Sequence, residues 1–293
     1  MISIDERLKY YLGDTNWEHP PTDHKQGYDV PIFITRENYK INWKTIHPNT
    51  AYPIDISRFL RYSDSMWFNC GDVAYTGPNW PMFIKIRDSH DLQSKGIIAN
   101  LNSQRHIGNI FKYPDIPWNE KKNELIWRGV DTGKNMTVRL DFVKQFKDKY
   151  DIGFSQYVQD ALKNPMKYPQ NLLKGPKTIE ELLKYKYLPV VDGNDKSSSL
   201  GWVMASNSLP IMPKPRFHSW MCEPWMKAGQ HYVEVKRDFS DLPEKLKWCI
   251  EHDDECQYIA EEGKKFMIQF MNPVAEEYLE RKLANYATIP RNC

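Results

Sequence analysis

Short apolar runs and longer amphipathic segments alternate through the second half of the chain, from about residue 124 onward. An apolar run of about 4–8 residues bounded by turn residues predicts a buried strand, and apolar positions spaced by three and four predict a helix. Strands that alternate with helices are typical of a parallel sheet covered on both faces. We therefore expect a doubly wound α/β fold for this half.

The individual elements follow from this pattern. Strands are predicted at 124–129, 187–191, 209–212 and 230–235, and helices at 136–150, 178–186, 199–208, 240–253, 254–271 and 272–287. Thr178 is the expected N-cap of its helix, because its hydroxyl can accept a hydrogen bond from the first turn. The first half has a weaker pattern, with candidate strands at 30–35, 80–88 and 96–102 and a proline-containing boundary or hinge at 111–123.

A polar turn at 192–199, with the sequence DGNDKSSS, follows one predicted strand and precedes a predicted helix. In doubly wound sheets ligands bind beyond the carboxyl ends of the strands, and the N–H groups at a helix start attract phosphate. Lys196 and the hydroxyls of Ser197, Ser198 and Ser199 add further donors. This turn is therefore a candidate anion site.

The turn RGVDTG, which follows the strand 124–129, repeats the arrangement, with Arg128, Thr132 and Arg139 close by in sequence. Two such turns in one sheet suggest a nucleotide or a nucleotide sugar. Either turn taken alone is equally consistent with an ordinary loop closed by helix caps.

Composition and charge narrow the classes of protein. At 293 residues the chain exceeds the usual size of one domain, and its 41% hydrophobic and 13% aromatic residues suffice for packed cores. The 40 basic and 38 acidic residues nearly balance, which argues against wrapping nucleic acid. Five cysteines without a C-x-x-C pair favour reduced thiols. With no run of about 18 apolar residues and no apolar leader at the N-terminus, we expect a soluble, cytoplasmic protein without membrane insertion.

Several motifs of known chemistry are absent from the sequence. Neither G-x-G-x-x-G nor G-x-x-x-x-G-K-[ST] occurs, which disfavours a dinucleotide-dependent dehydrogenase and a P-loop enzyme. H-E-x-x-H is missing, so we predict no zinc site. There is no Asp-x-Asp triplet, with which metal-dependent sugar transferases commonly hold a cation, and no G-x-S-x-G.

Four segments of the chain form a recognisable series: LIWRGVDTG, KYKYLPVVDGNDKSSSLGWVMASNSLPIM, QHYVEVKRDFSDLPEKLKW and HDDECQYIAEEGKKF. In order and spacing they resemble glycosyltransferase family 90. That family includes lipopolysaccharide-modifying and fungal capsule-associated transferases and the Rumi-type protein O-glucosyltransferases. The resemblance covers about residues 80–285 and is strongest from 124 onward, whereas residues 1–75 match no part of the family that we can place.

The resemblance implies a GT-B-like architecture, in which two Rossmann-like lobes hold the active site in the cleft between them without a metal ion. It implies an N-terminal acceptor-side lobe at 1–118, a nucleotide-sugar-binding lobe at 119–270, and a C-terminal helix within 271–293 that packs back on the first lobe. A chain this short most resembles the members found in large algal viruses, which add xylose to a capsid glycan. Such a protein would work in the host cytoplasm.

The resemblance also assigns residues that bind the nucleotide-sugar donor. Arg128 and Gly129 stand at the family's W/F-R-G strand end, and Arg139 matches an arginine that reaches the nucleotide diphosphate. A second donor loop is formed by Asp192, Gly193, Ser197, Ser198 and Ser199. The chain departs from the family at Ser199, where an arginine is usual. Possible replacements are Lys196, Lys214 and Arg216.

The catalytic base is the last residue that the resemblance supplies. The segment KIRD matches the family's V-R-D, whose aspartate is the base, and this makes Asp88 the candidate. Without the resemblance, an aspartate at a strand end is usually a solvated turn residue, and Asp72, Asp91 and Asp115 compete with it. The base is expected on the first lobe, facing the donor held by the second.

The resemblance therefore implies an inverting, metal-independent glycosyltransferase that needs no cofactor. It would move xylose or glucose from UDP-xylose or UDP-glucose to a hydroxyl group of a glycan acceptor, which in a virus could be a capsid glycan. One alternative is a hydrolase or phosphorylase on a similar two-lobed fold. Another is a non-catalytic protein that binds a glycan or a nucleotide sugar. Nucleic-acid binding is disfavoured by the near-neutral charge.

Overall fold

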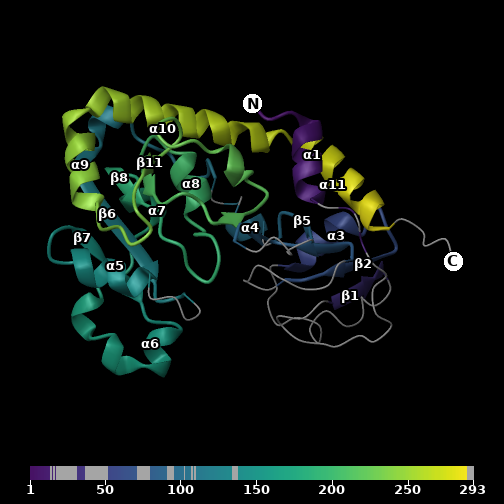
Figure 1. Cartoon of the computed structure of the whole chain (residues 1–293), viewed down its shortest axis with the longest axis horizontal. Helices are drawn as coiled ribbons and strands as arrows, with labels where there is room; N and C mark the ends of the chain where they lie inside the picture. The colour runs from purple at the N-terminus through teal and green to yellow at the C-terminus, as the bar shows by residue number, and fades with distance from the viewer. Residues whose placement is uncertain are drawn as a thin grey trace. The chain divides into compact units, whose positions relative to one another are not determined.

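The computed structural model describes residues 1–13, 15, 17, 32–36, 52–70, 80–90, 96–101, 103–106, 108, 110–133 and 138–288. The chain forms two compact units (Figure 1). Unit 1 comprises Met1–Arg105, Arg216–Trp225 and Gln269–Cys293, and unit 2 comprises His106–Pro215 and Met226–Ile268.

The sheet of unit 2 contains, in the described part of the chain, five strands that all run parallel. The strands are β6 (Lys122–Val130), β7 (Asp151–Gln156), β8 (Tyr185–Pro189), β9 (Leu209–Met212) and β11 (Val233–Glu234). Their order across the sheet is β7-β6-β8-β9-β11, which is 2-1-3-4-5 when the strands are counted along the chain. This is the order of flavodoxin-like doubly wound sheets.

Helices accompany these strands along the chain. In the part of unit 2 that the structure describes, the α-helices are α5 (Val138–Phe146), α6 (Asp160–Lys163), α7 (Ile179–Leu182), α8 (Leu200–Met204), α9 (Leu242–Glu251) and α10 (Asp253–Ile268). Short 3₁₀ turns lie at Trp118–Glu120, Pro165–Lys167 and Gln170–Leu172. Every residue of β8 and β9 is buried, so both faces of the sheet centre are covered. The α/β fold with a parallel sheet, predicted for this half, is confirmed.

Several element ends in unit 2 differ from the predicted ones. The capping box of Thr178 and Glu181 is present, but α7 ends at Leu182 because the chain enters β8 at Tyr185. Helix α8 stops at Met204 because the Ser206 hydroxyl replaces the next helical hydrogen bond. It donates to the carbonyl oxygen of Val203 and accepts from the N–H of Ser208.

Strands β7 and β11 also depart from the pattern. The predicted strand 230–235 shrinks to β11 because Gly229, at φ 73°, closes a turn with Tyr232. Strand β7 was not predicted, because its sequence DIGFSQ is short and half polar.

Unit 1 contains a four-stranded sheet in the order β1-β2-β3-β5 among the described residues. The strands are β1 (Ile32–Thr35), β2 (Ser65–Phe68), β3 (Met82–Ile84) and β5 (Ile97–Ile98). Strand β1 runs antiparallel to β2, and the other pairs are parallel. Unit 1 therefore also combines helices with a sheet that contains parallel strand pairs.

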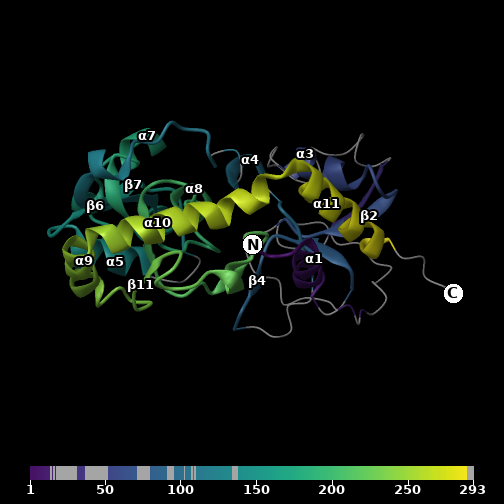
Figure 2. The same cartoon turned by 90° about the horizontal axis from the view of Figure 1, so that it is seen from above.

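The helices of unit 1 come from both ends of the chain. Among the described residues they are α1 (Ile4–Leu12), α3 (Tyr52–Phe59) and α11 (Pro273–Ala287), with 3₁₀ turns at Glu223–Trp225 and Gln269–Met271. Helix α4 (Ser103–His106) leads along the chain toward unit 2. Helix α11 packs against α1 and α3 (Figure 2), and the buried Arg7 of α1 pairs with Glu276 of α11 at 2.7 Å. The C-terminal helix thus belongs to the same unit as the N-terminus.

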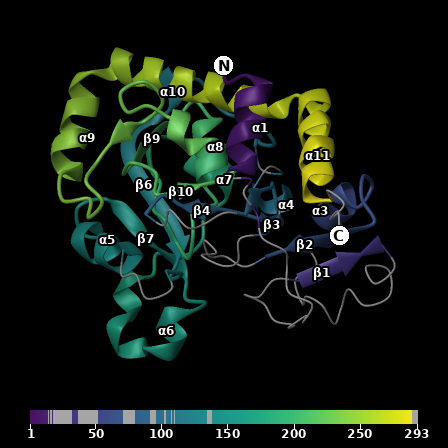
Figure 3. The ribbon, with the colours of Figure 1, turned by 45° about the vertical axis from the view of Figure 1, so that its right-hand side comes forward.

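The predicted strand 80–88 forms two short strands in two different sheets. Residues Met82–Ile84 pair with β2 and β5, whereas β4 (Arg87–Asp88) pairs antiparallel with β10 (Phe217–His218) (Figure 3). The ladder breaks at Lys85, which is buried despite its charge. A single strand at 80–88 is therefore wrong, and the break places Asp88 beside the segment that begins at Arg216.

None of the helices within the described ranges combines the length and the apolar character that crossing a membrane requires.

Candidate functional site

The point at which the strand order reverses lies at the carboxyl ends of β6 and β8. Strand β6 has β7 on one side and β8 on the other, so the connections after β6 and β8 leave the sheet in opposite directions. Doubly wound sheets bind ligands in the crevice that this divergence opens. The two turns predicted from the sequence, after β6 and after β8, meet at this point.

Arg139 of α5 joins the two turns. Its Nη1 donates to the carbonyl oxygen of Val130 at 2.9 Å and to Thr132 Oγ1 at 2.8 Å. Its Nη2 donates to the carbonyl oxygen of Val191 at 3.0 Å, and its Nε to that of Asp192 at 3.0 Å. These carbonyl and hydroxyl oxygens fix the direction of the guanidinium. The structure therefore brings Thr132, Arg139 and Asp192 together.

Gly193 allows this close approach. A Cβ at Gly193 would lie 2.8 Å from Thr132 Oγ1 and 3.0 Å from Arg139 Nη2. The next residue, Asn194, accepts a hydrogen bond from the N–H of Gly133 at 3.0 Å. A side chain at 193 would therefore displace the Thr132 hydroxyl and the Arg139 guanidinium from these positions.

The serines of the second turn lie at the start of α8. Ser197 is buried, and its hydroxyl is 2.9 Å from that of Ser199, whereas Ser198 and Ser199 are half-buried. Helix α8 has only five residues, and Ser199 caps it with backbone alone. A helix this short has only a small dipole, contrary to the expectation from the sequence, so cationic side chains must supply most of any attraction for an anion.

Asp192 places a carboxylate among these groups. Its Oδ1 accepts from the N–H of Ser197 at 3.3 Å, and its Oδ2 lies 3.8 Å from Arg237 Nη1. Burial raises the pKa of Asp192 to about 6, although Arg237, the Ser197 N–H and Arg139 oppose the shift. The carboxyl is thus poised to change its charge near neutral pH.

Arg237 was not singled out from the sequence. It follows β11, and its Nη2 donates to the carbonyl oxygen of Lys214 at 2.6 Å. Its side chain is 44% exposed, so it can reach a ligand at this edge of the sheet. Its position just after the predicted strand 230–235 was the available signal, since parallel strands bring their carboxyl ends to one edge.

Arg128 takes a different direction. Its Nη2 binds Asp151 Oδ1 at 2.6 Å and its Nη1 binds the carbonyl oxygen of Asp151 at 2.9 Å, with 5% of the side chain exposed. Asp151 is the first residue of β7, so this guanidinium faces the amino end of that strand. Gly129 packs on the Trp127 ring, which a Cβ would approach to 2.5 Å. Donor binding by Arg128 and Gly129 stays a prediction.

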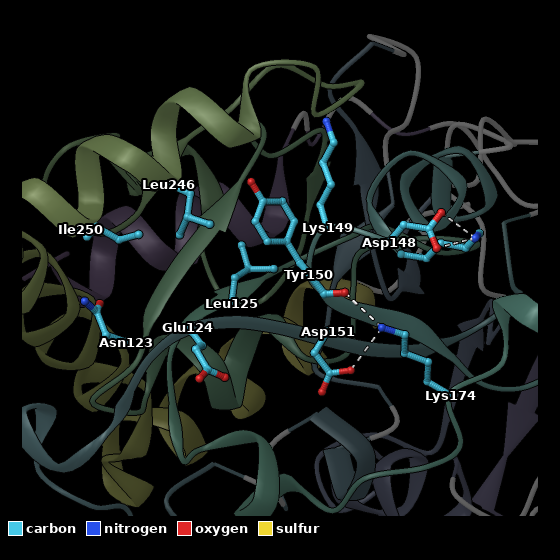
Figure 4. A pocket seen from close by; sticks show the side chains of 11 residues that line it. Asn123, Glu124, Leu125, Asp148, Lys149, Tyr150, Asp151, Lys174, Leu246 and Ile250 are labelled. Carbon is cyan, nitrogen blue, oxygen red and sulfur yellow. Dashed lines mark hydrogen bonds and ion pairs between the residues drawn. The ribbon is translucent and has the colours of Figure 1, made fainter.

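A pocket of about 490 Å³ lies at the amino ends of β6 and β7 (Figure 4). Asp151 lines it and is 3.5 Å from Lys174 Nζ, which also donates to the Tyr150 carbonyl oxygen. Three lysines face three acids in its wall: Lys147, Lys149 and Lys174 against Glu124, Asp148 and Asp151. Because the charges of these lysines and acids balance, the pocket does not favour an anion. It also lies at the amino ends of the strands, opposite to the edge at which β6 and β8 diverge.

Asp88, the base candidate, lies in unit 1. Its carboxylate accepts from Arg216 Nε at 2.9 and 3.0 Å, from Arg216 Nη2 at 2.5 Å and from the N–H of His90 at 3.0 Å. Burial raises the pKa of Asp88, but the hydrogen bonds from Arg216 and His90 outweigh it, so the pKa lies below the ordinary range. Arg216, considered as a replacement for the arginine missing at Ser199, is engaged with Asp88.

The competing aspartates are placed as follows. Asp115 lies in unit 2, where it binds the buried Lys121 ammonium and the N–H of Asn207. Asp72 and Asp91 lie outside the described residues. Within the described ranges, no three His, Cys, Asp or Glu side chains are grouped so that they could hold a metal ion.

Comparison with known proteins gives one family match. The family model described as "Glycosyl transferase family 90" matches residues 108–291. O-glucosyltransferase LpsA of Dichelobacter nodosus is 31% identical over 280 residues, which covers 94% of this chain and 79% of that protein. The likeness therefore extends into residues 1–75, which the sequence motifs did not place.

Animal proteins match over a shorter stretch. Protein O-glucosyltransferase 3 of Homo sapiens is 28% identical over 177 residues, or 56% of this chain and 33% of that protein. Protein O-glucosyltransferase 2 of Danio rerio is 29% identical over 157 residues, or 51% and 29%. The chain thus spans about one third of the length of these animal relatives.

Proposed function

The chain belongs to glycosyltransferase family 90, and from that premise we propose that it moves glucose or xylose from a UDP-sugar to a hydroxyl group of a glycan. Glycosyl transfer itself, to a glycan or a protein acceptor, follows from the family and from its O-glucosyltransferase relatives. The UDP donor, the sugar, inversion at the anomeric carbon and independence of metal are the finer parts of the proposal.

The observation that carries the donor proposal is Arg139 at the divergence of β6 and β8. A diphosphate needs concentrated positive charge and N–H or O–H donors, and charge-assisted hydrogen bonds supply both. Arg139 is held there by carbonyl oxygens of both turns, with the Thr132 hydroxyl beside it. We assign the diphosphate to these groups and to the 192–199 turn.

Arg237 is our candidate for the charge that the family usually supplies at the position of Ser199. It lies 3.8 Å from Asp192 and follows β11, so it belongs to the same edge of the sheet as Arg139. Lys214 contributes its carbonyl oxygen to hold Arg237, and Lys196 is buried. Among the three replacements considered from the sequence and Arg237, the exposed guanidinium of Arg237 is best suited to a diphosphate.

The proposed mechanism is a single in-line displacement. Asp88 takes the proton of the acceptor hydroxyl, the acceptor oxygen forms the new bond to the anomeric carbon, and UDP leaves from the opposite face with the electron pair of the broken bond. A positioned carboxylate contributes about 10²–10⁴-fold through such proton transfer. The two-lobed GT-B arrangement, with acceptor groups from unit 1 and donor groups from unit 2, is part of this proposal.

The proposed donor sugar and the proposed acceptor rest on different observations. The relatives named O-glucosyltransferases favour glucose. Xylose is kept as the second donor sugar from the resemblance to viral members of the family. Those two sugars differ by one hydroxymethyl group. We propose a glycan acceptor, with a protein hydroxyl as the second candidate because animal relatives are named protein O-glucosyltransferases. The cytoplasm stays the proposed compartment.

A donor screen tests the proposal. The protein is mixed with UDP-glucose, UDP-xylose, UDP-galactose or UDP-GlcNAc, and sugar release and thermal stabilisation are measured with EDTA or with Mn²⁺. We expect UDP-glucose or UDP-xylose to stabilise the fold and to be cleaved slowly in EDTA. Strict dependence on Mn²⁺ contradicts the metal-independent mechanism.

A non-catalytic nucleotide-sugar-binding protein is the second candidate. It is favoured by the serine at position 199 and by the ion pair that already occupies Asp88. The same screen separates the two, because a binding protein would be stabilised by a UDP-sugar without cleaving it.

A further inference from the structure

Arg216 and Asp88 form a two-pronged ion pair within unit 1. Nε and Nη2 of Arg216 both reach the carboxylate, at 2.5–3.0 Å, with 29% of the Arg216 side chain and 12% of the Asp88 side chain exposed. Parallel N–H bonds from a planar guanidinium fix the direction of a carboxylate as well as its charge. This pair differs from the exposed pair of Arg36 and Asp64, whose side chains are 52% and 90% exposed.

The fold delivers Arg216 to this position. Strand β10 pairs with β4 in the register Phe217 to Asp88, and the N–H of Ser89 donates to the Arg216 carbonyl oxygen at 2.9 Å. The segment after β10 is anchored in turn, because the buried Tyr11 hydroxyl donates to the Trp220 carbonyl oxygen at 2.6 Å. The arginine is therefore placed by backbone pairing across 128 positions of sequence.

Few charged groups face Asp88 in the described part of unit 1. Arg216 is the cation in contact, and His90 offers its backbone N–H and a nearby imidazole. Arg87, the preceding residue, directs its guanidinium to the carbonyl oxygens of Tyr10, Tyr11 and Gly96. His218 lies opposite Arg87 in the strand register. Arg216 is thus the group best placed to control Asp88.

We propose that Arg216 is a positioning residue for Asp88. The arginine keeps the carboxylate ionised and fixes its orientation, so that a lone pair of the carboxylate points toward the acceptor hydroxyl. This inference rests on the proposed role of Asp88 as the base. The arginine makes the base weaker but extends its working range to lower pH, since the carboxylate stays charged there. When Asp88 receives the acceptor proton it becomes neutral, and the pair with Arg216 loosens until the proton leaves.

The test is the pH profile of kcat/KM for cleavage of UDP-glucose or UDP-xylose, measured for Arg216→Gln and Arg216→Lys. An adjacent arginine lowers a carboxyl pKa by roughly 1–3 units, so the acidic limb should move up by about one unit or more in Arg216→Gln. Arg216→Lys keeps the charge and should restore part of the shift, and it keeps the test valid if the glutamine variant is poorly folded. The matched control Arg36→Gln removes an exposed arginine of unit 1 and should leave the profile unchanged.

Three results decide the outcome. If the acidic limb stays in place in both Arg216 variants, Arg216 does not control Asp88 and the inference is overturned. A UDP affinity lowered about tenfold with an unmoved limb overturns it too, and makes Arg216 a diphosphate ligand instead. If Asp88→Asn cleaves the donor at the wild-type rate while Arg139→Ala loses UDP binding, the assignment of the base fails and the donor site stands.

Discussion

The four arginines considered as anion ligands are held by different kinds of partner. Arg128 and Arg216 bind the carboxylates of Asp151 and Asp88, whereas Arg139 is held by carbonyl and hydroxyl oxygens. A guanidinium paired with a carboxylate must give up that pair before it can bind a phosphate. Arg139 stays our proposed diphosphate ligand because its side chain bridges the turns that follow β6 and β8.

Replacing Arg139 by alanine should weaken UDP binding about tenfold or more, because one charge-assisted hydrogen bond contributes about 1.5–3 kcal/mol. Isothermal titration calorimetry with UDP measures the change. Lys247→Ala is the control, because it removes an exposed cation on α9 and should bind UDP normally. Equal affinities in Arg139→Ala and the wild type would remove Arg139 from the donor site.

Asp192 should make donor binding depend on pH. Its pKa of about 6 lies above the ordinary value, so the carboxyl is neutral below pH 6 and charged above it. A charged carboxylate repels the diphosphate, so affinity for UDP-glucose should fall as the pH rises through about 6. The bound donor raises the pKa of Asp192 further. For each pH unit of that rise, the affinity at low pH should exceed the affinity at high pH by about tenfold.

The stability of the folded protein should change with pH in the same direction as the affinity for UDP-glucose. A carboxyl whose folded pKa is raised binds its proton more tightly in the folded state, so its contribution to stability falls as the pH rises from about 4 to about 6.

Asp192→Asn should flatten the pH dependence of UDP-glucose binding. A slope that persists in this variant would assign the titration to another group.

At the scale of helices and strands, the sequence predicted the regular part of the fold. The helices expected at 240–253, 254–271 and 272–287 are present as α9, α10 and α11, because their apolar spacing is long and regular. The strand at 80–88 failed, because alternation cannot show where a strand leaves one sheet and joins another. The partner of β4 lies far along the chain in β10, and such pairing is invisible to a local pattern.

For the candidate site, the sequence predicted where the turns lie but not which partners their side chains bind. The turns after β6 and β8 were found because they follow strands on one edge of a parallel sheet. The partners of the individual side chains were not, since Arg128 turns toward Asp151 and Arg216 toward Asp88 through contacts that only the folded chain defines. Arg237 was missed although it follows the predicted strand 230–235, because no motif marks it and its contact with Asp192 joins positions far apart in the sequence.

Asp131 connects β6 to helix α6, and its loss should destabilise the protein. The buried carboxylate accepts from the N–H groups of Val158, Gln159 and Ala161, at 2.5–3.3 Å. Asp131→Ala leaves these donors without that acceptor and should lower the free energy of unfolding by about 3 kcal/mol. Urea unfolding followed by fluorescence measures the change.

The matched variant for that experiment is Asp148→Ala. Asp148 is 82% exposed and pairs with Lys147, so its removal should change the free energy by no more than about 0.5 kcal/mol. If Asp131→Ala is as stable as Asp148→Ala, the connection after β7 does not depend on the Asp131 carboxylate.

At the scale of the whole molecule, the two units contribute different parts of the proposed reaction. Unit 2 carries the parallel sheet and the groups assigned to the donor, and unit 1 carries Asp88 with Arg216. The family model covers 108–291, and the match to the bacterial O-glucosyltransferase extends over 94% of the chain. The chemistry of family 90 therefore has its candidate groups on both units.

The sugar anomer that forms first shows whether transfer proceeds with inversion and with Asp88 as the base. UDP-α-glucose or UDP-α-xylose is cleaved without acceptor, water takes the place of the acceptor hydroxyl, and proton NMR follows the anomeric signal before mutarotation. We expect the β anomer first, a rate about 10²–10⁴-fold lower in Asp88→Asn with UDP binding intact, and a normal rate in the control Asp64→Asn, an exposed aspartate of unit 1. The α anomer first, or an undiminished rate in Asp88→Asn, would contradict inversion by this base.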